Sequence, residues 1–192
     1  MATRQRDTSL GKGVFYAPGD YVGIRRRFII LLVDSLVLAV AITCLAIVWL
    51  ILISGPPAVF TIASIGLFWI YEVVLKRSAT RTVGYRLTGC RIVNLQGQRP
   101  SLFALTFRAL LWMFGPFNLL FDLLWCGIDD DRQTLRDRFA ETCLINESAT
   151  PMGTGEIHLA YFDLGMFNLY YARVTHPKIA IGQRSDSALR ST

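Results

Sequence analysis

Residues 28–53 constrain this chain more than any other stretch, because they form an almost unbroken apolar run. As an α-helix this run would be about 39 Å long, enough to cross the roughly 30 Å hydrocarbon core of a bilayer with some tilt. It is too long for the apolar region of a cleavable signal peptide, and a polar segment precedes it. We therefore expect a first transmembrane helix at about Phe28 to Ile53.

Two ionisable residues mark the start of this helix. Arg27 stands at its N-terminal end, and Asp34 lies about two turns inside it. Seven residues of helix correspond to about 10 Å of rise and return to nearly the same face. A charge at that depth costs at least about 2.5 kcal/mol, so it normally faces protein or water. Both residues are therefore expected to be buried against protein rather than exposed to lipid.

The composition also favours a membrane protein. Of the 192 residues, 53% are hydrophobic and only 18% are charged, whereas charged residues make up about 25% of soluble domains. This length suits one domain with tails. The net charge of +6 comes from basic residues that flank apolar segments. The positive-inside rule explains such a pattern better than nucleic-acid binding does, so the expected partner is the lipid bilayer, with no nucleic acid.

A second apolar segment, at about Val59 to Leu75, follows the helix-breaking run of residues 54–57. Glu72, near the far end of this span, is within reach of Lys76 and predicts an interfacial ion pair. The loop of residues 76–101 carries six basic residues and no acidic one. This bias places the loop, and with it an N-terminal arm of residues 1–20, on the cytoplasmic side of a bacterial inner membrane. The six residues are Lys76, Arg77, Arg81, Arg86, Arg91 and Arg99.

A third apolar segment, residues 102–128, is interrupted by Arg108, by Asp122 and by Gly115-Pro116 between them. It could form one kinked span, since proline kinks a helix, or a re-entrant hairpin that brings Arg108 and Asp122 to one depth, where they could pair. We favour the hairpin. Residues 91–95 and 142–145 both have strand character, and their pairing would require the hairpin. The predicted fold is thus an all-α membrane protein with two transmembrane helices, a broken third apolar segment and a small cytoplasmic β element.

The tail of residues 147–192 is first aromatic and then polar. It is too interrupted for a confident span, and exposed aromatic residues are typical of surfaces that dock a partner. The candidate docking residues are Tyr161, Phe162, Phe167, Tyr170 and Tyr171.

No pattern in the sequence predicts catalysis. His158 and His176 are isolated, and the cysteines lack the spacing of a zinc site or a disulfide framework. The chain also has no nucleophile elbow, P-loop or His-Glu-x-x-His motif. We expect a protein without catalytic residues, metal ligands or cofactors.

Several short motifs occur in an order that resembles the RDD family of bacterial membrane proteins. The arginine at the opening of the first span falls on Arg27, the first aspartate on Asp34, and the second aspartate on Asp137 within Leu-Arg-Asp-Arg-Phe. Thr82-Val83-Gly84 matches a further family stretch, and Arg108 another position. The similarity covers about residues 21–146, which we take as the membrane domain.

The resemblance implies the fold and the location more strongly than a reaction. For some members of the family, transport, including sodium–proton exchange, has been suggested. From the residues, we expect a non-enzymatic accessory or docking subunit of a membrane complex, or else a homo-oligomer. Buried charges would hold it together, with Arg27 paired to Asp34 or Asp137 and Arg108 paired to Asp122. The alternative is proton or sodium transport by an oligomer that uses the intramembrane aspartates.

Overall fold

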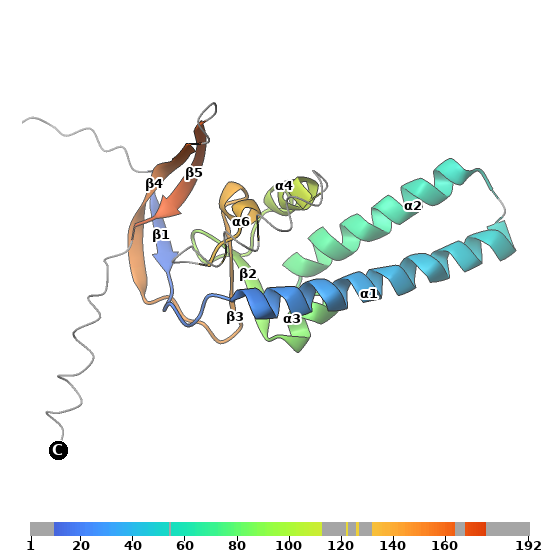
Figure 1. The fold of residues 1–192 in the computed structure, drawn as a ribbon, viewed down its shortest axis with the longest axis horizontal. Coiled ribbons are helices and arrows are strands. Elements are labelled where there is room, and N and C mark those ends of the chain that lie inside the picture. Colours follow the sequence, from blue (N-terminus) through green and yellow to red (C-terminus); the bar gives the residue numbers. More distant parts are fainter. Residues whose placement is uncertain are drawn as a thin grey trace, which may run out of the picture.

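The computed structural model describes residues 10–53, 55–112, 122, 126, 132–163 and 168–175. Two long helices, α1 and α2, run side by side and project from a head in which the strands and the short helices gather (Figure 1). The chain is therefore built from an apolar helical pair and a mixed α/β head.

The helical pair matches the two predicted spans. Helix α1 (Ile24–Val48) continues into a π-helical turn, η1 (Trp49–Ile53), and α2 (Pro57–Trp69) continues into η2 (Ile70–Leu75). The resulting rods of 30 and 19 residues are about 45 and 28 Å long. Only 6% of the apolar window of each is buried. The prediction of two long apolar helices is confirmed, and α1 begins four residues earlier than expected.

One narrow stripe of α1 faces the protein. Its buried residues are Arg27, Ile30, Asp34 and Leu38, which are spaced three or four apart and so share one helix face. The inward stripe of this otherwise lipid-soluble helix therefore carries both of its buried charged residues.

Within the described residues, three shorter helices cover the base of the pair. They are α3 (Val83–Leu87), α4 (Leu102–Trp112) and α6 (Leu135–Phe139). Thr134 caps α6, and Asp137 completes a reciprocal capping box with it. The Gly115-Pro116 dipeptide, on which the choice between hairpin and kinked span depends, lies outside the described residues.

Strands β2 (Cys90–Asn94) and β3 (Thr142–Asn146) pair in antiparallel fashion, with Val93 opposite Cys143. This is the pairing expected from the strand character of the two segments. It brings the segment before α4 and the segment after α6 into one small sheet.

A second, three-stranded sheet makes the all-α prediction wrong. It has the order β1-β4-β5 and consists of β1 (Lys12–Phe15), β4 (Gly153–Asp163) and β5 (Asn168–Val174). The predicted N-terminal arm thus contributes a strand that pairs with the C-terminal tail. In the figure, β1 lies against β4 at the end of the head farthest from the tips of α1 and α2 (Figure 1).

Two buried clusters hold the head together. One includes Tyr16, Val93, Ile145, Ile157 and Val174 and joins the two sheets. The other includes Val22, Ile30, Val73, Tyr85 and Leu105 and joins the small sheet to the bases of the helices. Because the first cluster includes residues from before position 21 and after position 146, the predicted arm and tail pack on the membrane domain instead of hanging free.

Candidate functional site

Asp137 is the centre of the buried charge network. Its two carboxylate oxygens accept hydrogen bonds from two arginines, Arg27 Nη1 at 2.6 Å and Arg108 Nε at 2.7 Å. Arg27 also donates to the carbonyl oxygens of Val22 and Arg132. Since Arg27, Arg108 and Asp137 come from α1, α4 and α6, one carboxylate ties three helices together.

The electrostatics of Asp137 favour its charged form. Burial alone would raise the pKa of Asp137, but the positive charges of Arg108 and Arg27 outweigh it and hold this pKa well below its ordinary value. The carboxyl group is therefore ionised throughout the physiological pH range. Such charge-assisted hydrogen bonds are among the strongest in proteins.

Asp34 lies on the same stripe of α1 but has uncharged partners. Its carboxylate accepts hydrogen bonds from Tyr71 Oη at 2.9 Å, Thr82 Oγ1 at 2.9 Å and the backbone N–H of Gly84 at 2.8 Å. Of the two pairings considered for Arg27, the structure therefore contains the one with Asp137 and not the one with Asp34. Asp34 instead joins α1 to η2 and to the start of α3.

Gly84 is required by this arrangement. A Cβ atom at this position would lie 2.8 Å from Asp34 Oδ1 and 2.9 Å from the carbonyl oxygen of Ile30. A side chain would therefore separate α3 from α1 and break the contact with the carboxylate.

The predicted pair of Arg108 and Asp122 is wrong. Asp122 pairs with the side chain of Arg136, whose backbone N–H also donates to it at 3.3 Å. Arg108 takes Asp137 instead. The reason is that α6 packs beside α4 and supplies Asp137 as a partner for Arg108 and Arg136 as a partner for Asp122. The prediction considered residues 102–128 alone and therefore did not include these two residues.

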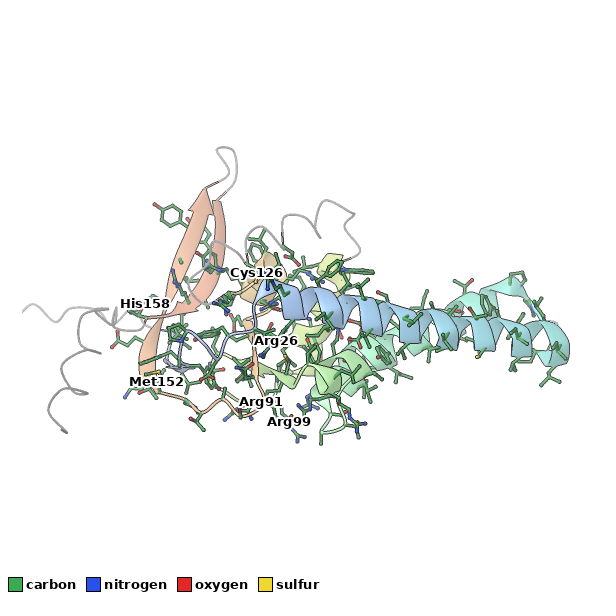
Figure 2. All side chains as sticks on the ribbon, turned by 60° about the horizontal axis from the view of Figure 1, so that its bottom comes forward. Arg26, Arg91, Arg99, Cys126, Met152 and His158 are labelled. Atoms are coloured by element: carbon green, nitrogen blue, oxygen red, sulfur yellow. The ribbon has the colours of Figure 1, made fainter. Side chains whose placement is uncertain are left out.

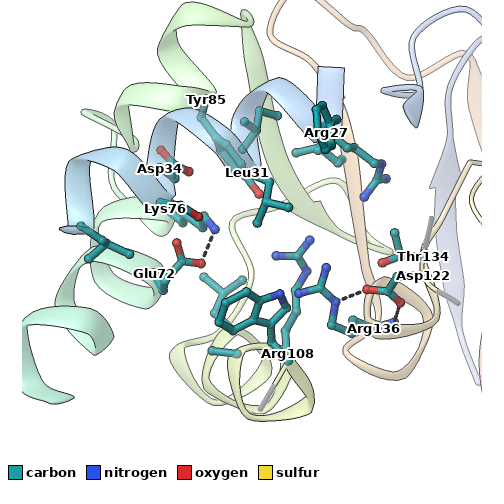
Figure 3. A pocket seen from close by; sticks show the side chains of 18 of the residues that line it. Arg27, Leu31, Asp34, Glu72, Lys76, Tyr85, Arg108, Asp122, Thr134 and Arg136 are labelled. Carbon is teal, nitrogen blue, oxygen red and sulfur yellow. Dashed lines mark hydrogen bonds and ion pairs between the residues drawn. The ribbon is translucent and has the colours of Figure 1, made fainter. Parts of the chain in front are cut away.

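These groups surround a cavity between α1, η2, α4 and α6, with a volume of about 100 Å³. Glu72 forms an ion pair with Lys76, as expected from their spacing, and both line the cavity. Figure 3 shows Asp34, Lys76 and Glu72 on one side and Arg108, Arg136 and Asp122 on the other. The cavity thus combines charged walls with apolar residues of the helical pair.

The family model for the RDD family matches residues 21–141, more than half of the chain. The chain belongs to the RDD family. No curated protein and no solved structure matches it. Together with the two long apolar helices, RDD membership indicates an integral membrane protein.

Within this RDD protein, the three residues of the family resemblance do not form one cluster of contacts. Arg27 and Asp137 are paired, whereas Asp34 binds Tyr71, Thr82 and Gly84. Reasoning from the sequence missed Tyr71 and Arg136 altogether. The Thr82-x-Gly84 motif did carry a signal, because a hydroxyl and a glycine N–H two residues apart can converge on one carboxylate.

The docking residues predicted in the tail divide into two groups. Tyr161 and Tyr170 lie opposite each other on β4 and β5 and are 65% and 62% exposed, and their ring centroids are 6.2 Å apart. Tyr171 instead stacks under the guanidinium group of Arg138, at 4.5 Å from its ring centroid. Phe167 and the side chain of Phe162 lie outside the described residues.

The described part of the chain contains no group of three or more His, Cys, Asp or Glu side chains placed to hold a metal ion. His158 interacts with Glu156 on the surface of β4. The chemistry that the described site offers is therefore that of paired charges and hydrogen bonds inside a membrane protein.

Proposed function

We propose that this RDD protein is a non-enzymatic accessory subunit of a membrane complex, which docks another membrane protein through the outer end of the β4–β5 hairpin. One observation carries the proposal. Along one face of the two strands, Ile157, Ala172 and Val174 are buried in the core between the sheets. The same face continues outward as Leu159, Tyr161 and Tyr170, which are exposed.

An apolar face that continues beyond its own core is typical of an interaction surface. Tyrosine is enriched in the buried centres of protein interfaces, because it brings apolar area together with a hydroxyl group. Lipid is a less suitable cover for this face, since β4 lies at the end of the head away from the helical pair (Figure 1).

The proposal places the head and both described ends of the chain on the cytoplasmic side of a bacterial inner membrane. The pairing of β2 with β3 supports this orientation, because it holds residues 94 and 142 on the same side of the bilayer. Helix α4, with 11 residues, is about 16 Å long and too short to cross. Arg26, Arg91 and Arg99 all lie toward the head (Figure 2), as the positive-inside rule requires of a cytoplasmic face.

The charge network suits such a subunit. The recorded hydrogen bonds of Asp34 and Asp137 tie α1 to η2, α3, α4 and α6. Groups that hold elements in register in this way are expected to be structural. Their role would be to present the docking face at a fixed distance from the membrane.

The test is co-purification from native membranes in a gentle detergent. A Tyr161→Ser, Tyr170→Ser double variant should lose the partner that accompanies the wild type, at unchanged yield and elution volume. The matched control is Glu156→Gln, His158→Asn, which alters an exposed polar pair on the other face of β4. Retention of the same partner by the tyrosine variant would contradict the proposal.

Ion exchange by an oligomer is the second candidate function, and the cavity favours it, because Asp34 and Glu72 both line it next to the spans. Carboxylates within membrane segments commonly carry protons or cations in transporters. Reconstituted wild type would then exchange sodium for protons, and Asp34→Asn would abolish the exchange. Absence of flux from well-assembled wild-type proteoliposomes would exclude this function.

A further inference from the structure

Two arginines at the cavity use only part of their hydrogen-bonding capacity. Arg108 donates Nε to Asp137, and Arg136 donates Nε to Asp122. A guanidinium group has five N–H donors, and within the described ranges no acceptor is recorded for the terminal nitrogens of either residue. The two side chains are only 11% and 17% exposed, so these nitrogens face the cavity rather than bulk water.

Both guanidinium groups reach into the same space (Figure 3). Each guanidinium group is paired with a carboxylate through its Nε, and its terminal N–H groups can donate to a further acceptor in the cavity. The nearby carboxylates are already engaged. Asp122 and Asp137 accept from the arginines, Glu72 pairs with Lys76, and Asp34 accepts from Tyr71, Thr82 and Gly84. The geometry of paired guanidinium forks matches the tetrahedral oxygens of a phosphate group.

Another part of the cavity wall is apolar, and this indicates which class of phosphate compound would fit. Phe28, Leu31, Phe68 and Trp112 line the same cavity. Phe28 on α1 is also 49% exposed, and Trp112 on α4 is 39% exposed, with its ring centroid 6.4 Å from that of Phe68 on α2. A ligand that fills this space would therefore have a charged head and hydrocarbon chains.

We propose that the cavity binds the phosphate group of a membrane phospholipid, with Arg108 and Arg136 as its donors and the acyl chains leaving past Phe28 and Trp112. Lys76 also lines the cavity, where it is paired with Glu72. The volume of about 100 Å³ is well above the roughly 10–15 Å³ that one water molecule needs on the same measure. The bound lipid would lie at the seam between the helical pair and the head.

The proposal is tested by titrating the detergent-solubilised full chain with a short-chain phosphatidylglycerol and counting bound lipids by native mass spectrometry. Wild type should bind one lipid, and the double variant Asp122→Asn, Arg136→Gln should bind it about tenfold more weakly or worse. This variant removes both charges of the ion pair together, so that neither residue is left as an unpaired charge. Arg25→Gln is the control, because Arg25 is an exposed arginine of α1 that does not line the cavity.

Further probes separate the two parts of the ligand. Inorganic phosphate has the group without chains, and diacylglycerol has the chains without the group. Neither should displace the lipid at equal concentration. Trp112→Ala, which lies outside the charge network, should weaken the lipid complex, and it carries the test if the double variant does not fold.

Three results would overturn the proposal. The first is that the wild type and whichever of the two variants folds bind the lipid equally well. The second is that Arg25→Gln weakens lipid binding as much as that variant does. The third is that inorganic phosphate competes for the cavity as strongly as the lipid does. The last result would mark the cavity as a site for a soluble anion.

Discussion

At the scale of single residues, Asp137 has the largest expected effect on stability. Asp137→Asn would leave Arg27 and Arg108 buried without their shared counter-charge, and removal of one partner of a buried ion pair typically costs about 3–5 kcal/mol. We expect a large drop in the melting temperature of the detergent-solubilised protein, measured by intrinsic fluorescence. Glu147→Gln is the comparison, because Glu147 pairs with Arg81 at an exposed position and should leave the melting temperature almost unchanged.

The pH dependence of stability follows from the lowered pKa of Asp137. A carboxyl group whose folded-state pKa is depressed stabilises the fold above its unfolded pKa of about 3.9 and loses this contribution as the pH falls toward the folded value. The stability difference between wild type and Asp137→Asn should therefore be constant from pH 7 down to about pH 5 and shrink in stronger acid. A difference that disappears already near neutral pH would show that Asp137 is not held ionised by its arginines.

Gly84 allows a sharper test of the Asp34 contacts. Gly84→Ala would place a Cβ against Asp34 and the carbonyl of Ile30, and such overpacking costs about 1–3 kcal/mol. Gly66→Ala is the matched control, since nothing lies within 4 Å of a Cβ there and alanine is the better helix former. Equal melting temperatures for the two variants would contradict the close approach of α3 to α1.

The sequence identified the charged residues at this scale better than it identified their partners. Periodicity places Arg27 and Asp34 on one face of a helix, but the donor of a hydrogen bond can come from any element that folds back. Asp34 is matched by Tyr71, Thr82 and Gly84, which lie 37 to 50 positions away. A single sequence contains no direct signal for such a contact.

At the scale of elements, the length of an apolar run predicted the helices reliably, whereas the residue pattern did not predict strands β4 and β5. The spans were predictable because about 20 consecutive apolar residues have few other interpretations. Strands β4 and β5 were missed because their aromatic residues were interpreted as an interrupted apolar run. Their alternation becomes clear only in the register that sets Tyr161 opposite Tyr170 and Leu159 opposite Ala172.

The register of β2 and β3 can be tested by a disulfide. Val93 lies directly opposite Cys143, and facing residues of an antiparallel pair have Cβ atoms close enough to bridge. Val93→Cys should form this disulfide on mild oxidation when the other three cysteines are replaced by alanine, as detected by mass spectrometry of peptides. Ile92→Cys, which faces Leu144, should not form it, and the reverse result would indicate a slipped register.

At the scale of the whole molecule, the chain separates into a helical pair, which is apolar, and a mixed α/β head (Figure 1). The sequence predicted the two apolar spans and a small β element, but not the three-stranded sheet of the head. It could not predict that the first and last strands of the head pair with each other, because contacts between distant segments depend on the complete fold. The proposed docking face of β4 and β5 and the proposed lipid site both depend on the head lying on one side of the bilayer.

The most direct measurement of that arrangement is labelling of single cysteines with a membrane-impermeant maleimide, in a background in which the four native cysteines are replaced by alanine. Pro56→Cys lies between the two spans, and Gln98→Cys and Ser148→Cys lie on exposed parts of the head. We expect Pro56→Cys to be labelled on intact spheroplasts and the other two only after permeabilisation. Labelling of Gln98→Cys or Ser148→Cys on intact spheroplasts would contradict the account.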